Sequence, residues 1–330
     1  MVGFATLTLA LSQRERENRS APVTYLLERT ESVKPYFDSM EGFGKALKPG
    51  RVKRAAASAD ELRAVEAGIA AAVREVEEAG FPTEKINKRG WMTVYQRLEY
   101  LVDAGTWHPL HTLYNPLENE EGTTNVVDGL GQIAGRWAVV IGFDNKVMAG
   151  AWLPGQAENI LRATDLAGRL NIPLVWLVNC SGAKLPVQEK FYADRRGAGT
   201  PFYRHAELEQ AGIPVLAGIY GTNPAGGGYQ AVSPTILLAH KDANMAVGGV
   251  GIVSGMAPKG GFDVEMVEEL IAKTREFTGR PPGDIATHHD ATGFFTQVYD
   301  EETGVLDGIK DYMRAIPAYG AVFFQAAEPK

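Results

Sequence analysis

Two stretches of the sequence decide its fold, LVNCSGAK at Leu177–Lys184 and IYGTNPAGGGY at Ile219–Tyr229. Each begins as an apolar strand and continues into small residues, where a backbone can approach a ligand closely. If a helix starts after each stretch, its free N–H groups face the same ligand. The two stretches together predict a pair of backbone donors that converge on one oxygen atom, an arrangement that stabilises a thioester carbonyl as it becomes an enolate.

Other short motifs do not account for these stretches. The phosphate loop needs Lys-Ser or Lys-Thr after its second glycine, and the glycine spacing of the dinucleotide fingerprint is absent here. A hydrolase elbow would place Ser181 in a G-x-S-x-G pattern, which is missing. Cys180 stands between an apolar strand and a glycine, so we expect a buried, inert thiol. Either stretch alone is as typical of a turn without a ligand.

Strand and helix patterns alternate around the two stretches, from about Asn125 onward. Such alternation predicts an α/β domain with a largely buried sheet. Strands are predicted at Trp137–Phe143, Leu174–Leu177, Val215–Ile219 and Thr235–Leu238, and helices at Gln156–Leu170, Arg204–Ala211, Val264–Phe277 and Asp307–Ile316.

Helical patterns dominate the part of the chain before this domain. Ser58 and Glu61 form a capping box that predicts the start of a helix, and Gly80 predicts its end. Within it, one face carries Leu62, Val65, Ile69, Ala72 and Val76, for which we expect a packing role. A second helix is predicted at Met92–Val102. We therefore divide the chain into an extension at 1–20, a helical segment at 21–120 and the α/β domain at 121–330.

Bulk composition excludes several classes of protein. The net charge of −7 argues against a general nucleic-acid or membrane-surface binder, although a local basic pocket for a phosphorylated ligand stays open. The single cysteine, Cys180, cannot form an intrachain disulfide, which favours a reducing cytoplasm. No apolar run approaches the ~20 residues that span a bilayer.

Several further motifs occur along the chain in a fixed order. They are Lys88–Thr93, Arg97–Leu98, Leu101–Gly105, Gly129–Arg136, Pro201–Ala206, Gly212–Pro214, and His288 with Thr292-Gly293. In this order they resemble the biotin-dependent carboxyltransferases, a family within the crotonase superfamily. The resemblance to the N-terminal half of that family extends from about Tyr36 to Lys330 and implies a crotonase-like ββα-spiral domain.

Three segments resemble the glutaconyl-CoA decarboxylase branch of this family in particular, namely Asn87–Gly90, Ala151–Gln156 and Thr222–Tyr229. The resemblance implies that the N–H groups of Ala183 and Gly226 form the oxyanion hole. They would hold the thioester oxygen of glutaconyl-CoA while its distal carboxyl group passes to biotin, which gives crotonyl-CoA.

Other residues are candidates for substrate binding near this hole. We expect these residues to line the pocket: Ser181, Gly182, Asn223, Ala225, Gly227 and Tyr229. Purely structural roles stay open for two of them, turn formation for Asn223 and core packing for Tyr229. Arg195 and Arg196 form the best basic loop for a CoA phosphate or a substrate carboxylate, and a solvated turn explains them equally well. His288-His289-Asp290 resembles a metal cluster, but adjacent histidines in an extended strand would face opposite ways. We therefore predict no bound metal.

The resemblance also implies partners. Family members carry a second crotonase-like half that presents carboxybiotin, and this sequence stops at Lys330, where that half would begin. A truncated sequence and a separate chain for the second half both remain open. The implied partners are a biotin carrier protein, the second half, further copies of the chain and a membrane decarboxylase subunit, which would hold this cytoplasmic chain at the inner membrane.

Two alternative functions remain open. A stand-alone hydratase or isomerase would share the oxyanion hole but needs a carboxylate facing the substrate, and Glu189 is the only acidic residue close to the first stretch in the sequence. A non-catalytic assembly subunit would keep the fold as an interaction surface; losing the paired glycines would favour it, and they are intact.

Overall fold

The computed structural model describes residues 48–190, 192, 195–230, 233–246, 264–280 and 283–316. The chain divides into two compact units, residues 1–63 and 64–330. Apart from Lys48, the described part of the first unit belongs to α3 (Pro49–Glu78), a helix that continues into the second. The extension predicted at 1–20 lies outside the described residues.

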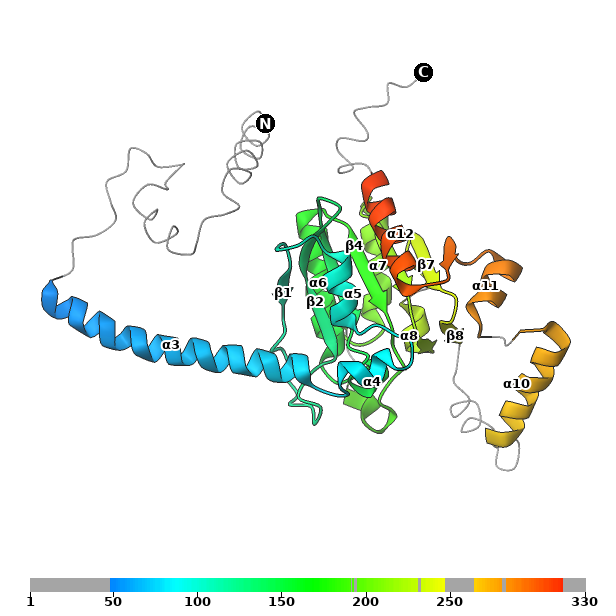
Figure 1. Ribbon diagram of the computed structural model, residues 1–330, viewed down its shortest axis with the longest axis horizontal. Coiled ribbons are helices and arrows are strands. Elements are labelled where there is room, and N and C mark those ends of the chain that lie inside the picture. Colours follow the sequence, from blue (N-terminus) through cyan, green and yellow to red (C-terminus); the bar gives the residue numbers. More distant parts are fainter. Residues whose placement is uncertain are drawn as a thin grey trace, which may run out of the picture. The chain divides into compact units, whose positions relative to one another are not determined.

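A seven-stranded sheet forms the centre of the second unit, in the order β1-β2-β3-β4-β5-β7-β9 (Figure 1). The β1–β2 and β2–β3 pairs are antiparallel, and all later neighbours are parallel. The strands are β1 (His108–Leu110), β2 (Val126–Ile133), β3 (Arg136–Phe143), β4 (Leu174–Val178), β5 (Val215–Ile219), β7 (Ile236–His240) and β9 (Gln297–Tyr299). Two short strands, β6 (Thr222–Pro224) and β8 (Asn244–Ala246), form a separate parallel pair.

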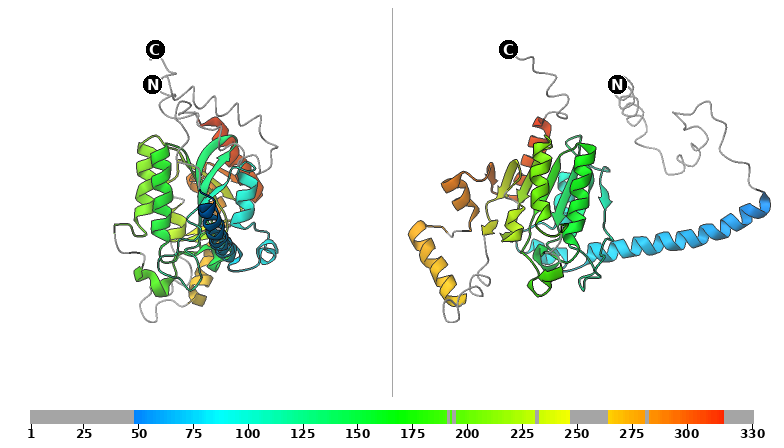
Figure 2. Two further views of the ribbon diagram at one scale, coloured as in Figure 1. Left: turned by 90° about the vertical axis from the view of Figure 1, so that its left-hand side faces the viewer. Right: turned by 180° about the vertical axis from the view of Figure 1, so that it is seen from behind.

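Helices cover both faces of the sheet (Figures 1 and 2). On one face, α6 (Gln156–Leu170) and α7 (Thr200–Gln210) pack side by side; on the other lie α5 (Val94–Leu101) and α12 (Glu302–Ala315). The remaining helices among the described residues are α4 (Thr83–Asn87), η2 (Met148–Gly150), η3 (Leu185–Lys190), α8 (Gly226–Tyr229), α10 (Val264–Thr278) and α11 (Ile285–Thr292). No helix in the described ranges is both long and apolar enough to cross a membrane.

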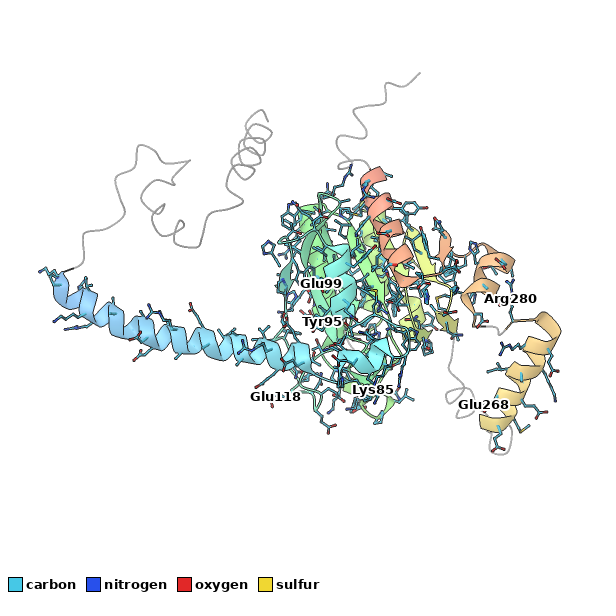
Figure 3. All side chains as sticks on the ribbon, in the orientation of Figure 1. Lys85, Tyr95, Glu99, Glu118, Glu268 and Arg280 are labelled. Atoms are coloured by element: carbon cyan, nitrogen blue, oxygen red, sulfur yellow. The ribbon has the colours of Figure 1, made fainter. Side chains whose placement is uncertain are left out.

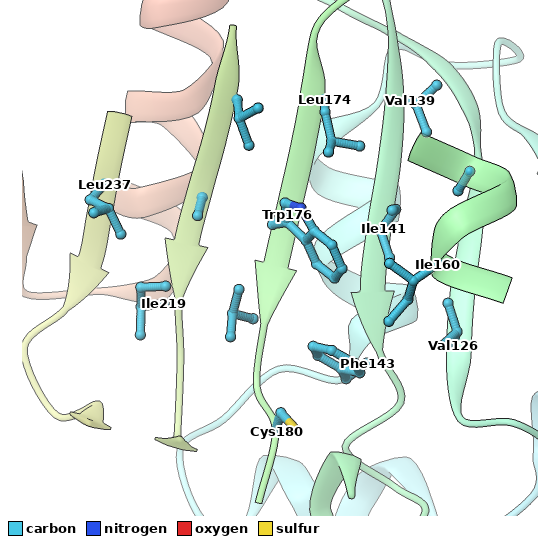
Figure 4. Packing of buried hydrophobic residues seen from close by; sticks show 14 of the residues in the cluster. Val126, Val139, Ile141, Phe143, Ile160, Leu174, Trp176, Cys180, Ile219 and Leu237 are labelled. Atoms are coloured by element: carbon cyan, nitrogen blue, oxygen red, sulfur yellow. The ribbon is translucent and has the colours of Figure 1, made fainter. Parts of the chain in front are cut away.

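The alternation of side chains along β4 produces two hydrophobic cores. Leu174, Trp176 and Val178 enter the cluster beneath α6 and α7 (Figure 4), whereas Val175 and Leu177 enter the cluster beneath α5 and α12. Every residue of β4 is buried, as expected for a parallel strand covered on both faces. The predicted α/β architecture with a buried sheet is confirmed.

One buried ion pair joins the two helices of the second face. Arg97 on α5 donates from Nε to Glu302 Oε2 at 2.8 Å and from Nη2 to Glu302 Oε1 at 3.0 Å. The guanidinium also stacks over the ring of Tyr220, 4.1 Å from its centroid. Because Tyr220 directly follows β5, this pair links α5 and α12 to the edge of the sheet where β5 ends.

Most predicted elements lie where the sequence placed them, with shifts at their ends. The helix at Gln156–Leu170 and the strand at Val215–Ile219 have the predicted bounds. The capping box predicted at Ser58 is wrong, because α3 already begins at Pro49 and Ser58 lies inside it. The boundary predicted at residue 121 stays a prediction; β1, which pairs with β2, lies before it.

Candidate active site

The two glycine-containing stretches lie next to each other at the edge where β4 and β5 end. The strands are parallel, with Val178 opposite Ile219, so both chains leave the sheet at the same edge. The side chain of Asn223 then joins them: its Oδ1 accepts the N–H of Cys180 at 2.8 Å, and its Nδ2 donates to the carbonyl of Tyr220 at 2.8 Å. Asn223 is fully buried. It therefore fixes the distance between the two stretches.

Glycines allow the two backbones to touch. A Cβ on Gly227 would overlap the carbonyl of Cys180, and a Cβ on Gly182 would lie 3.6 Å from Cγ of Pro224. Gly182 also has a φ of +96°, a conformation that favours glycine. By contrast, a Cβ on Gly226 would meet no described atom within 4 Å, so there is open space beside this residue.

Ala183 lies in a parallel bridge with Trp152. The N–H of Trp152 donates to the carbonyl of Gly182 at 2.8 Å, and the N–H of Lys184 donates to the carbonyl of Trp152 at 3.0 Å. In a parallel bridge of this pattern, the residue between the two bonded neighbours turns its own N–H and C=O away from the partner strand. The N–H of Ala183 therefore points away from Trp152.

Gly226 begins α8 directly after a strained turn. Ala225 has a φ of +46° and a ψ of −120°, a sparsely populated conformation for a residue with a side chain, and its N–H donates to the carbonyl of Ala246 at 2.8 Å. As the first residue of its helix, Gly226 has an N–H without an intrahelical acceptor. After the first stretch, the 3₁₀ helix η3 follows in place of an α-helix.

A turn at Met148–Gly150 also contacts the first stretch. The N–H of Ser181 donates to the carbonyl of Ala149 at 3.1 Å, and its Oγ donates to the carbonyl of Met148 at 2.9 Å. A Cβ on Gly150 would overlap the carbonyl of Asn179. The hydroxyl of Ser181 thus holds the turn, a role that the sequence did not reveal.

An acidic pair from a distant loop lies beside the first stretch. Nζ of Lys184 is 2.6 Å from Oε1 of Glu121 and 3.4 Å from Oε2 of Glu120. The hydrogen bond to Glu121 raises the pKa of Lys184. Glu189 is the acidic residue close to the first stretch in the sequence, and folding adds Glu120 and Glu121 from more than 60 positions away.

Cys180 and Tyr229 differ in their surroundings. Cys180 is fully buried, as predicted, and burial raises the pKa of its thiol to about 12. Tyr229 is 45% exposed, which excludes the core-packing alternative. Its ring meets Phe202 edge-on, with centroids 5.6 Å apart, and Phe202 in turn contacts Trp152. The second stretch therefore ends in an exposed aromatic side chain.

The basic loop contacts carboxylates of this chain. Arg196 pairs with Glu158 on α6, and its Nη2 lies 3.6 Å from Oδ2 of Asp165. The contact with Glu158 raises the pKa of Arg196. The carbonyl of Arg195 accepts a hydrogen bond from Thr200 Oγ1 at 2.7 Å. A phosphate at Arg196 would have to compete with two carboxylates.

His288 and His289 lie on helix α11, so the extended strand expected there is wrong. Nε2 of His288 is 3.0 Å from the carbonyl of Met245, and Nδ1 of His289 is 3.1 Å from the carbonyl of Phe295. Within the described ranges no three potential metal-ligating side chains cluster. Both histidines hold neighbouring backbone in place.

A cavity of about 400 Å³ lies apart from the predicted site residues, none of which lines it. Tyr95 and Glu99, both on α5 (Figure 3), line it together with Asp144 and Lys146. Nζ of Lys146 is 3.9 Å from Oδ2 of Asp144. Burial raises the pKa of Asp144 to about 6, because the effect of burial outweighs the opposing effect of the nearby Lys146 charge.

The sequence matches a known domain family. The model of the carboxyl transferase domain matches residues 85–330. The glutaconyl-CoA decarboxylase subunit alpha of Acidaminococcus fermentans is 51% identical over 301 residues, which cover 91% of this chain and 50% of that protein. The methylmalonyl-CoA decarboxylase subunit alpha of Propionigenium modestum is 25% identical over 71% of this chain and 43% of that protein. The chain thus spans about half the length of such relatives.

Solved structures share the fold. The beta subunit of geranyl-CoA carboxylase from P. aeruginosa superposes with a TM-score of 0.60 at 19% identity, over 84% of this chain and 49% of that chain. Transcarboxylase 12S, solved with methylmalonyl-coenzyme A and methylmalonic acid bound, gives a TM-score of 0.61 at 20% identity with the same coverage. At these identities the likeness establishes the fold.

Proposed function

Since the chain belongs to the carboxyl transferase domain family, we propose that it forms the acyl-CoA-binding half of a biotin-dependent acyl-CoA decarboxylase. The observation that carries the proposal is the junction of the two stretches, in which Asn223 and the contact of Gly227 with Cys180 hold Ala183 and Gly226 on adjacent segments. Two fixed N–H donors in this arrangement suit an oxyanion that develops on a thioester oxygen.

Glutaconyl-CoA is the substrate that we favour, on the identity to a glutaconyl-CoA decarboxylase subunit. The bond between its distal carboxylate and the adjacent carbon would break, and the electron pair would pass through the conjugated double bond to the thioester oxygen. The N–H groups of Ala183 and Gly226 would stabilise that charge. Protonation of the distal carbon then gives crotonyl-CoA. Because the charge is delocalised, neutral donors suffice and no strong base is required.

Biotin, carried by a partner subunit, would accept the released carboxyl group. The donors at the junction are neutral backbone groups, which fits a reaction in which the carboxyl group leaves toward an external acceptor. The second crotonase-like half of the relatives, or a chain equivalent to it, would present that acceptor. This chain alone should therefore bind acyl-CoA but turn over poorly; biotin-dependent decarboxylation by the chain alone would contradict this requirement.

The hydratase alternative gains no support from the acidic residues that folding brings to the site. Glu121 lies closest to the first stretch, and it is bound to Lys184 at 2.6 Å. A general base for water addition would have to face the substrate with a free carboxylate. Glu189 is exposed on η3.

The test is calorimetric titration of the chain with glutaconyl-CoA, methylmalonyl-CoA, malonyl-CoA and free CoA. We expect glutaconyl-CoA to bind more tightly than free CoA. A thioether analogue, in which CH₂ replaces the thioester carbonyl, serves as the matched control because it offers the two N–H groups no acceptor. Equal affinity for the thioester and the thioether would contradict the oxyanion assignment, and no binding of any ester would contradict the acyl-CoA pocket.

A further inference from the structure

Helix α3 carries a row of exposed apolar side chains that its own chain does not cover in the described residues. Leu62, Val65 and Ile69 are 63%, 59% and 51% exposed. They follow each other at spacings of three and four residues, the pattern of a coiled-coil seam. Ala55 and Ala72, each seven residues beyond a member of this row, extend the seam with small side chains. An exposed apolar surface of this kind marks an interaction site.

The charges of α3 are distributed against its own dipole. Arg51, Lys53 and Arg54 stand near its start, and Glu75, Glu77 and Glu78 stand at its end. Acidic residues stabilise a helix near the N-terminus and basic residues near the C-terminus. The first turn of α3 contains no acidic residue and the last turn no basic one. Taken alone, the helix is therefore disfavoured electrostatically.

We propose that α3 pairs with α3 of a second copy of this chain, in antiparallel orientation and with Leu62, Val65 and Ile69 in the seam. In that orientation the basic end of each helix lies beside the acidic end of the other. Because the pair has two-fold symmetry, opposite charges meet at both ends of the pair. The same charge pattern opposes a parallel pair, in which like charges would meet. The alanines at both ends of the seam allow the backbones to approach closely.

Cysteine cross-linking in the full chain tests the orientation. Ala55→Cys and Ala72→Cys are made as separate variants, mixed, and treated with a short bis-maleimide. Because Cys180 is fully buried, the introduced thiols are the reactive ones. The two positions are roughly 25 Å apart along the helix at ~1.5 Å per residue, so a single variant cannot cross-link to itself in an antiparallel pair. We expect covalent dimers from the mixture only.

Dimers from either variant alone would overturn the antiparallel arrangement, and no dimers from any sample would overturn the pairing. Val65→Glu, combined with the two cysteines, tests the seam, since it places an unpaired charge between the helices. We expect it to lower the cross-linking yield about tenfold or more. The control is Ala67→Glu, which lies on the opposite face of α3 and should leave the yield unchanged. A yield that is unaffected by Val65→Glu would overturn the seam.

Discussion

In the proposed reaction, Gly226 acts only through its backbone N–H group, one of the two oxyanion donors. Gly226→Pro removes this donor at the first helical position, where proline is tolerated by the helix itself. We expect kcat of the complete enzyme to fall about 10²–10³-fold, as for other oxyanion donors. Gly226→Ala retains the N–H and has space for its methyl group, so it should stay close to the original rate. Equal losses in the two variants would show that the N–H is not the essential group, and thermal unfolding checks that both fold.

Asn223 positions both stretches through one buried amide. Asn223→Ala leaves the N–H of Cys180 without its acceptor in a buried site, which costs about 1–3 kcal/mol of unfolding free energy. We expect a lower urea midpoint together with weaker discrimination between glutaconyl-CoA and free CoA in calorimetry. Thr222→Ala, at the exposed neighbouring position, is the control and should change neither.

Asp144 should make stability depend on pH. Its pKa is raised from 3.8 in the unfolded chain to about 6 in the folded protein, so the folded state binds the proton more tightly. The resulting stabilisation is fully present below about pH 3.8 and is lost as the pH rises through about 6. In urea unfolding, Asp144→Asn should therefore gain stability relative to the original protein between pH 4 and pH 7. A difference that is constant across this range would contradict the shift.

Among the elements, α5 and α12 depend on each other through Arg97 and Glu302. Arg97→Met leaves a buried carboxylate without its partner, and we expect a loss of about 3–5 kcal/mol in urea unfolding. The double variant Arg97→Met, Glu302→Leu buries no unpaired charge and should recover much of this loss. If the double variant were as unstable as the sum of both single variants, the two residues would not be coupled.

The extent to which the sequence predicted these elements follows from local physics. The helix Gln156–Leu170 has a clear apolar face and β5 is a short apolar run, so both were placed correctly. The start of α3 was missed because Arg51–Ala59 has no apolar period; its alanines and basic residues favour a helix through intrinsic propensity. The helix predicted at Met92–Val102 begins two residues later, because Thr93 caps it: the Thr93 hydroxyl accepts the N–H of Gln96, and the Gln96 side chain accepts the N–H of Thr93.

The candidate site was only partly predictable for a different reason. The two stretches are recognisable in the sequence because small residues follow apolar strands, and parallel pairing of those strands then brings the stretches together. The pairing of Lys184 with Glu121 and the bracing of Ser181 by Met148 are contacts between distant segments, which no local pattern encodes. The sequence indicates a turn or a pocket-lining role for Asn223, but it does not indicate the hydrogen bond by which Asn223 joins the two stretches.

At the scale of the whole molecule, the two outer strands of the sheet determine whether a strand of another molecule can be added to it. The outer strands β1 and β9 have only three residues each, and β1 contains Pro109, which offers no backbone N–H for pairing. Short outer strands and proline hinder the addition of a further strand from another molecule. The described sheet is thus protected against edge-to-edge aggregation, and copies of this protein should associate through helices without joining their sheets.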